Sequence, residues 1–150
     1  MSRERLSKIA LIGNYLPRKC GIATFTYDLG RALTHDGSGP ECFVVAVNDR
    51  PEGYAYSPDV RFEIAEQDLP SYRLAADFLQ SANVDVLCVQ HEFGIYGGAA
   101  GSHLLALLRR LDLPIHGRKR ERPKAADWVL LHGIQAAFCG RVPDELGKGG

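Results

Sequence analysis

KIALIGNYLPRKCGIATFTYDLGRAL, residues 8–33, is the stretch that decides the fold, because the spacing of its apolar residues changes part-way along. Residues 9–12 form a short continuous apolar run, which is typical of a strand buried on both faces of a parallel sheet. From Ile22 onward the apolar positions fall on one stripe of a helix. These positions are Ile22, Phe25, Leu29, Ala32 and Leu33. The stretch therefore predicts a strand, a loop and a helix in that order.

The loop between the predicted strand and helix carries two cations and a glycine at the helix start. Arg18 and Lys19 precede Gly21, which lets a ligand approach the backbone closely. The first amides of a helix have no internal partners and attract anions. These residues predict a phosphate or sugar-phosphate site, with the alternative that Gly21 only turns the chain and both charges are solvated. The loop has neither the P-loop nor the dinucleotide-binding glycine pattern.

The composition is that of an ordinary globular domain. The chain has 150 residues, of which 45% are hydrophobic and 24% charged, and its formal net charge is zero. A balanced charge gives no indication of a nucleic-acid partner. No apolar run approaches the roughly 18 residues of a membrane span, and the charged residues 1–8 do not resemble a leader. We therefore expect a cytoplasmic protein without a membrane span.

The four cysteines, Cys20, Cys42, Cys88 and Cys139, are widely spaced and form no C-x-x-C pair. This spacing predicts neither a zinc site nor a disulfide framework. Cys42 and Cys88 lie in apolar runs and are expected in the core. Cys20 lies beside Lys19 at a helix start, so it is either a reactive thiol or an unreactive loop thiol.

The later part of the chain repeats the alternation of strands and helices. Apolar residues 42–48 predict a second buried strand, and the alternating residues 60–65 predict a half-exposed edge strand. Helices are expected over residues 70–82 and 104–111, with a buried strand at 84–90 between them. This order predicts an α/β fold, a Rossmann-like doubly wound parallel sheet, whose ligands lie beyond the carboxyl ends of the strands.

A second polar loop, HEFGIYGG, follows the strand at residues 84–90. His91 and Glu92 are placed to hydrogen-bond sugar hydroxyls or to transfer protons, or else only to satisfy nearby backbone groups. Tyr96 could stack on a sugar face or fill a gap. Three glycines allow the loop to approach a ligand or to move, namely Gly94, Gly97 and Gly98. No third ligand is spaced to form a metal site with His91 and Glu92.

The two loop motifs carry a resemblance to a known family. PRKCGIATFT at residues 17–26 and VDVLCVQHEFGIYGG at 84–98 resemble the amino-terminal domain of bacterial family 4 glycosyltransferases, which are retaining GT-B enzymes. The resemblance covers residues 8–115 and includes VNDRPEGYAYSPDVRFEI at 47–64. It implies that residues 1–115 are the acceptor-side half of a two-domain enzyme whose other domain holds the nucleotide-sugar.

The resemblance also implies roles for the two loops. The loop with Arg18, Lys19 and Gly21 would approach the donor diphosphate and the transferred sugar, and the loop with His91 and Glu92 would line the acceptor side. The same acceptor loop contains Tyr96, Gly97 and Gly98. Most GT-B enzymes need no metal, so the expected ligands are a nucleoside diphosphate sugar and a hydroxyl acceptor, with no cofactor.

The activity implied is transfer of a glycosyl group to an acceptor hydroxyl with retention of configuration. One alternative is a non-catalytic domain that binds a phosphorylated ligand or a partner protein through the same loops. A nucleotide-dependent oxidoreductase is a weaker alternative, because the dinucleotide glycine pattern is missing.

The sequence departs from the family pattern after Ile115. A strand ending in a histidine near the reacting sugar carbon is expected there, but HGRKRERPK follows instead. Residues 116–150 hold 7 basic and 4 acidic residues, whereas residues 1–115 hold 11 and 14. We interpret residues 116–150 as an irregular tail left by a truncation or a shifted reading frame. The catalytic histidine is then unassigned, and residues 1–150 alone are expected to be inactive without a donor domain.

Two alternatives concern this tail. WVLLH at residues 128–132 could be the displaced family strand, which makes His132 a weak candidate for the missing histidine. The basic run at residues 118–124 could bind nucleic acid or an acidic partner, although a solvated segment is commoner for a run without aromatic residues.

Overall fold

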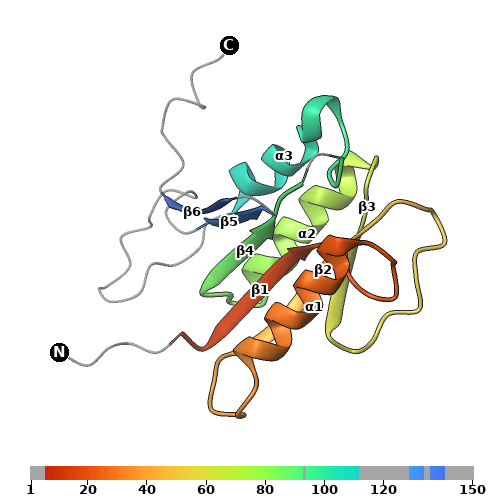
Figure 1. Cartoon of the computed structure of the whole chain (residues 1–150). Coiled ribbons are helices and arrows are strands. Elements are labelled where there is room, and N and C mark those ends of the chain that lie inside the picture. The colour runs from red at the N-terminus through yellow and green to blue at the C-terminus, as the bar shows by residue number, and fades with distance from the viewer. Residues whose placement is uncertain (1–5, 93, 112–128, 134–135, 141–150) are drawn as a thin grey trace.

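The structure, a computed structural model, describes residues 6–92, 94–111, 129–133 and 136–140. These residues form an alternating series of strands and helices (Figure 1). The elements are β1 (Lys8–Gly13), α1 (Gly21–Leu33), β2 (Glu41–Asn48), β3 (Val60–Ala65), α2 (Leu69–Ser81), β4 (Val86–Gln90), the short 3-10 turn η1 (Ala99–Gly101), α3 (His103–Arg110), β5 (Val129–Gly133) and β6 (Ala136–Gly140).

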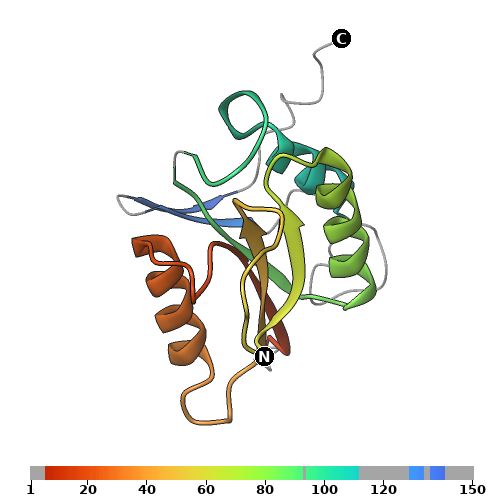
Figure 2. The ribbon, with the colours of Figure 1, turned by 90° about the vertical axis from the view of Figure 1, so that its right-hand side faces the viewer.

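The strands form one sheet in the order β3-β2-β1-β4-β5-β6. The pairs from β3 to β5 are parallel, and β6 joins β5 in antiparallel orientation. Helix α1 covers one face of the sheet and α2 and α3 cover the other, which gives three layers (Figure 2). The prediction of an α/β fold built on a parallel sheet is confirmed.

The carboxyl-terminal region differs in part from the expected irregular tail. Strand β5 pairs in parallel with β4 from Leu87↔Val129 to Gln90↔His132. This pairing agrees with the alternative in which residues 128–132 supply the strand that follows β4 in the sheet. Sequence reasoning gave that alternative little weight because His132 comes 17 residues after Ile115, where the family pattern needs only a few. The basic run at residues 118–124 lies outside the described residues, as does the rest of the tail between and beyond β5 and β6.

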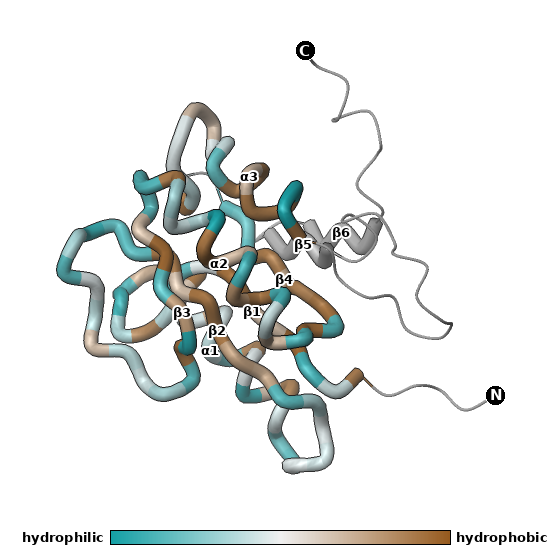
Figure 3. The backbone as a smooth tube through the Cα atoms, turned by 180° about the vertical axis from the view of Figure 1, so that it is seen from behind, coloured by the Kyte–Doolittle hydropathy of each residue, from teal (hydrophilic) through white to brown (hydrophobic). Residues whose placement is uncertain are grey.

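Strand β1 shows why the sheet is buried on both faces. Ala10 and Ile12 pack in the cluster beneath α2 and α3, whereas Ile9 and Leu11 pack in the cluster beneath α1. Successive side chains of a strand point to opposite faces, so a strand covered on both sides must be apolar throughout. Hydrophobic residues accordingly gather along the strands in the middle of the molecule (Figure 3).

Two cysteines take the core positions expected for them. Cys88 is buried in β4 and Cys42 is half-buried in β2, and both belong to the side of the sheet that α1 covers. Burial raises the pKa of each thiol to about 11, because a thiolate loses hydration there. Neither group is therefore a ready nucleophile at neutral pH.

Buried tyrosines give the fold a dependence on alkaline pH. Burial is the main cause that raises the pKa of Tyr56 and of Tyr72 to about 12, and it raises that of Tyr96 well above the ordinary value of 10.0. Protons are therefore held more tightly by the folded chain than by the unfolded chain. We expect this contribution to stability to be complete below pH 10 and to be lost between pH 10 and 12. Unfolding monitored by fluorescence across this range, with tyrosinate absorbance in parallel, measures the loss; full ionisation of all tyrosines in the folded chain near pH 10 would contradict it.

Candidate functional site

Four loops meet at the carboxyl edge of the parallel strands. They follow β1, β2, β3 and β4 and comprise residues 14–20, 49–59, 66–68 and 91–98. In an open parallel sheet this edge is where ligands bind. Both loops singled out in the sequence, the one before Gly21 and the one after Gln90, lie at this edge because β1 and β4 are neighbours.

The start of α1 is capped by a thiol. Cys20 Sγ accepts a hydrogen bond from the Ala23 amide at 3.4 Å and a second from Asn14 Nδ2 at 3.7 Å. Cysteine is not one of the usual N-cap residues, so the sequence gave no signal of this role. Cys20 is thus explained by helix capping, and neither of the two sequence alternatives had named it.

Gly21 is not required by packing or by backbone geometry. A Cβ at this position would meet nothing within 4 Å, and Gly21 is not among the residues with positive φ. The alternative in which Gly21 only turns the chain is therefore not supported, because the backbone conformation here does not require a glycine. The structure gives the amides of Gly21 and Ile22 no hydrogen-bond partner within the described part of the chain. Two helix-start amides without a partner in the described chain are suited to an anion.

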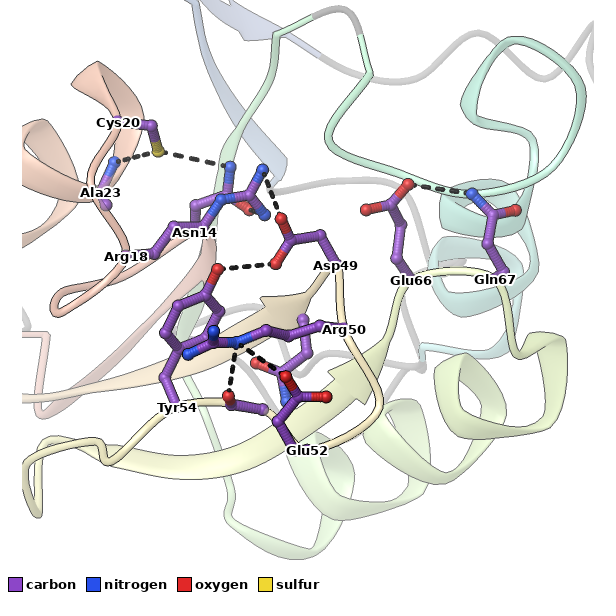
Figure 4. Close-up of polar contacts among 12 residues, drawn as sticks. Asn14, Arg18, Cys20, Ala23, Asp49, Arg50, Glu52, Tyr54, Glu66 and Gln67 are labelled. Carbon is purple, nitrogen blue, oxygen red and sulfur yellow. Dashed lines mark hydrogen bonds and ion pairs between the residues drawn. The ribbon is translucent and has the colours of Figure 1, made fainter.

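Arg18 and Lys19 differ in their surroundings. The side chain of Arg18 is only 20% exposed, and its Nη1 donates to Asn14 Oδ1 at 3.1 Å while Nη2 lies 3.5 Å from Asp49 Oδ2 (Figure 4). Lys19 is exposed. The alternative of two solvated charges is therefore wrong for Arg18, whose position is fixed by the loop after β2.

The loop after β2 contains a series of polar side-chain contacts that the sequence analysis did not predict. Asp49 Oδ1 accepts a hydrogen bond from the Tyr54 hydroxyl at 2.8 Å, and the Arg50 guanidinium lies 3.9 Å from the centre of the Tyr54 ring. Partial burial acts to raise the pKa of Asp49, but the Tyr54 hydrogen bond and the Arg18 and Arg50 charges lower it below its usual value. The available signal was the position of Asp49, directly after a buried strand beside β1.

The loop after β4 places its polar and aromatic residues differently. His91 and Glu92 are exposed at the carboxyl edge, and the His91 ring lies 6.1 Å from the Tyr96 ring, centre to centre. Tyr96 is 4% exposed, and its hydroxyl donates to the Gln90 carbonyl at 2.6 Å and lies 3.3 Å from the Ile12 carbonyl. Of the two alternatives for Tyr96, the burial of its ring and the hydrogen bond from its hydroxyl to the end of β4 favour the gap-filling role over stacking on a sugar, although Tyr96 was named with the acceptor-binding residues.

Gly97 and Gly98 are fixed by packing and do not provide mobility. The Gly97 amide donates to the Tyr72 hydroxyl at 3.0 Å, and the Gly98 amide donates to Gln67 Oε1 at 3.4 Å. A Cβ on Gly97 would lie 1.9 Å from the Glu66 carbonyl oxygen. These two glycines therefore hold the loop against α2 and the β3–α2 turn. Of the three loop glycines, Gly94 alone has open space around its Cβ position.

Gln90 is a buried polar residue that the sequence did not single out. It is fully buried at the end of β4, its Nε2 lies 3.4 Å from Cys88 Sγ, and its Oε1 has no hydrogen-bond partner among the residues that the structure describes. Gly13 gives it room, because a Cβ there would lie 2.8 Å from Gln90 Cβ. The paired residue on β5 is His132, whose backbone lies in register with Gln90. An unpaired amide oxygen in the core destabilises the fold.

Replacement of Gln90 by methionine tests whether the unpaired amide oxygen destabilises the fold. Methionine has a similar shape and no polar group to desolvate, so we expect Gln90→Met to raise the free energy of unfolding by about 1 kcal/mol. Chemical denaturation of both proteins measures the difference. A loss of stability of similar size would show that the Gln90 amide has a hydrogen-bond role in the folded chain.

Neither a metal cluster nor a membrane-spanning helix is found in the parts of the chain that the structure describes. No three His, Cys, Asp or Glu side chains gather there in an arrangement that could hold a metal ion. None of the described helices is long and apolar enough to cross a membrane. No family model matches the sequence, and no curated protein is significantly similar to it.

Proposed function

We propose that this chain is the acceptor-side half of a retaining GT-B glycosyltransferase of the family 4 type. The observation that carries the proposal is the convergence of the two family-like loops at one edge. The hydroxyl of Tyr96, in the loop after β4, donates to the Gln90 carbonyl at the end of β4 and lies close to the Ile12 carbonyl near the end of β1. The start of α1 and the His91–Glu92 pair therefore lie at the same edge of the sheet, beyond the carboxyl ends of β1 and β4.

The start of α1 is the proposed contact for the donor diphosphate. The free amides of Gly21 and Ile22 carry the positive end of the helix dipole, and the fixed guanidinium of Arg18 is nearby in the same loop. Donors that are already oriented stabilise negative charge as it develops on a departing diphosphate. Lys19 adds an exposed cation at the same place.

The acceptor side is assigned to His91 and Glu92. Both are exposed, and a carboxylate and an imidazole can hydrogen-bond the hydroxyls of a sugar. The backbone pairing of β5 with β4 supports His132 as the counterpart of the family histidine, since it follows the strand that the family pattern places there.

Calorimetry with nucleotide-sugars tests this function. We expect UDP-glucose or GDP-mannose to bind, and Gly21→Ala to weaken binding about tenfold, because the added methyl group keeps the phosphate oxygens away from the amides that would donate hydrogen bonds to them. Gly21→Ala has open space, so its stability is expected to match the parent chain. The 150-residue polypeptide alone is expected to release no nucleoside diphosphate above background.

The other outcomes separate the alternatives. Binding of glucose 6-phosphate with the same Gly21 dependence, but of neither nucleotide-sugar, would favour a non-catalytic phosphate-binding domain. Binding of NAD⁺ alone would favour an oxidoreductase. If none of these compounds binds, or if Gly21→Ala binds as tightly as the parent, the proposed donor site is wrong.

A further inference from the structure

The Arg18 side chain lies in an unusual setting for a residue that is to contact a ligand. It is four-fifths buried, and one carboxylate, that of Asp49 at 3.5 Å, balances its charge. A guanidinium has five N–H groups, and the structure gives partners to two of them, on Asn14 and on Asp49, within the described residues. The remaining donors of Arg18 are held in one orientation, ready for an oxygen-rich ligand.

The carboxylate that holds Arg18 is itself held by its own loop. One oxygen of Asp49 receives the Tyr54 hydroxyl and the other faces Arg18. The Tyr54 ring is covered by Arg50, whose Nε donates to the Gly53 carbonyl at 2.9 Å (Figure 4). Asp49 therefore has little freedom to turn away from Arg18.

The loop backbone supports the same arrangement. Gly53 has φ +61°, and a Cβ there would lie 2.9 Å from Asn48 Nδ2. Tyr56 donates its hydroxyl to Asn48 Oδ1 at 2.5 Å. The loop after β2 is thus fastened to the end of its own strand, and Asp49 bridges from it to the loop after β1.

We propose that Asp49 is a positioning residue, which with Tyr54 holds the Arg18 guanidinium beside the start of α1 to receive an anionic diphosphate. This inference rests on the proposed function and deepens it. It assigns a role to the loop at residues 49–59, for which the family resemblance implied none. A carboxylate beside an anion site repels the ligand, so its presence there needs the compensation that an oriented guanidinium provides.

That repulsion makes the test decisive, because the two roles of Asp49 predict opposite signs. If Asp49 acts only as a nearby negative charge, Asp49→Asn tightens the binding of pyrophosphate and of UDP-glucose. If Asp49 positions Arg18, Asp49→Asn weakens binding about three- to fivefold, the equivalent of losing an ion pair. Asp49→Glu, which keeps the charge and can still reach Arg18, is expected to restore part of the affinity.

Glu52 supplies the matched control. It lies in the same loop and pairs with Arg50, and it makes no contact with Arg18 among the described residues. Glu52→Gln removes the same charge without touching the Arg18–Asp49 pair, so its affinity is expected to equal that of the parent or to rise slightly. Tyr54→Phe, which removes only the hydroxyl that orients Asp49, is expected to weaken binding in the same direction as Asp49→Asn.

A measurement without ligand separates this inference from the proposed function. In NMR spectra of the full chain, the Arg18 Nε–Hε signal is expected to report an ordered side chain in the parent and in Glu52→Gln, and a mobile one in Asp49→Asn and Tyr54→Phe. An ordered Arg18 in Asp49→Asn, or tighter anion binding by that variant, would overturn the inference. If the parent binds neither pyrophosphate nor UDP-glucose, the proposed function fails, while the Arg18 signal still decides whether Asp49 positions it. Should Asp49→Asn not fold, Tyr54→Phe carries both readouts.

Discussion

Gly97→Ala is expected to lower the free energy of unfolding by about 3 kcal/mol or more, because the added methyl group meets backbone. Its Cβ would lie 1.9 Å from the Glu66 carbonyl oxygen and 2.9 Å from His103 Nδ1. The carbonyl cannot rotate away as a flexible side chain can. Relief would require the loop to move and the hydrogen bond from the Gly97 amide to Tyr72 to break. Chemical denaturation of the variant measures the effect.

Gly21→Ala is the matched control for Gly97→Ala, since it makes the same chemical change at the first residue of α1. A Cβ at Gly21 meets nothing within 4 Å, and alanine is a better helix former than glycine. Its stability is expected to equal or slightly exceed that of the parent. A Gly97→Ala protein as stable as Gly21→Ala would show that the loop after β4 is free to move, which was one of the two possibilities that its glycines left open in the sequence.

Tyr96→Phe is expected to destabilise the fold by about 2 kcal/mol. The phenyl ring still fills the same space, so the change isolates the hydroxyl. That hydroxyl serves the Gln90 carbonyl at 2.6 Å and approaches the Ile12 carbonyl at 3.3 Å, and water cannot readily replace it in a residue 4% exposed. The Gln90 carbonyl at the end of β4 would then lose, in a buried place, the hydrogen bond that it accepts from this hydroxyl.

Tyr27→Phe provides the comparison for Tyr96→Phe. Tyr27 is half-buried on α1, and the structure gives its hydroxyl no hydrogen-bond partner among the described residues. We expect a change within about 0.5 kcal/mol for this variant. Equal effects of the two substitutions, measured by the same denaturation, would contradict the role assigned to the Tyr96 hydroxyl.

The local elements were predictable because each has a regular pattern on the scale of a few residues. Residues 42–48 are apolar without a break, and they form the buried strand β2. Residues 60–65 alternate, and β3 is the half-exposed edge strand that this alternation indicates. The change from a continuous run to a helical stripe in residues 8–33 likewise gives β1 and α1.

The contacts that build the site depend on groups far apart in the sequence, and no local pattern reveals them. Arg18 and Asp49 meet because β1 and β2 are neighbours, yet one residue is in the glycine loop and the other is in a segment without periodicity. Tyr96 has the aromatic character of a ligand platform, and only its hydrogen bonds to two strand ends show that it faces inward.

The tail shows a different limit of sequence reasoning. A basic run after residue 115 argued for the end of the sheet, since unpaired charges are costly in a central strand. The chain instead resumes the sheet at β5, whose backbone pairs with β4. Pairing between strands separated by nearly forty residues is decided by the whole sheet, and residues 128–132 alone could not establish it.

Amide NMR of the full chain, titrated with UDP-glucose and with GDP-mannose, tests the central claim most directly. The claim is that one edge of the sheet, formed by the start of α1 and the loop after β4, receives a sugar and its phosphates. We predict that the signals of Gly21, Ile22 and Glu92 move together, with little change at Gly37 and Asn83, which lie in loops that precede β2 and β4. Shifts confined to Gly37 and Asn83, or no shift with either compound, would contradict the account.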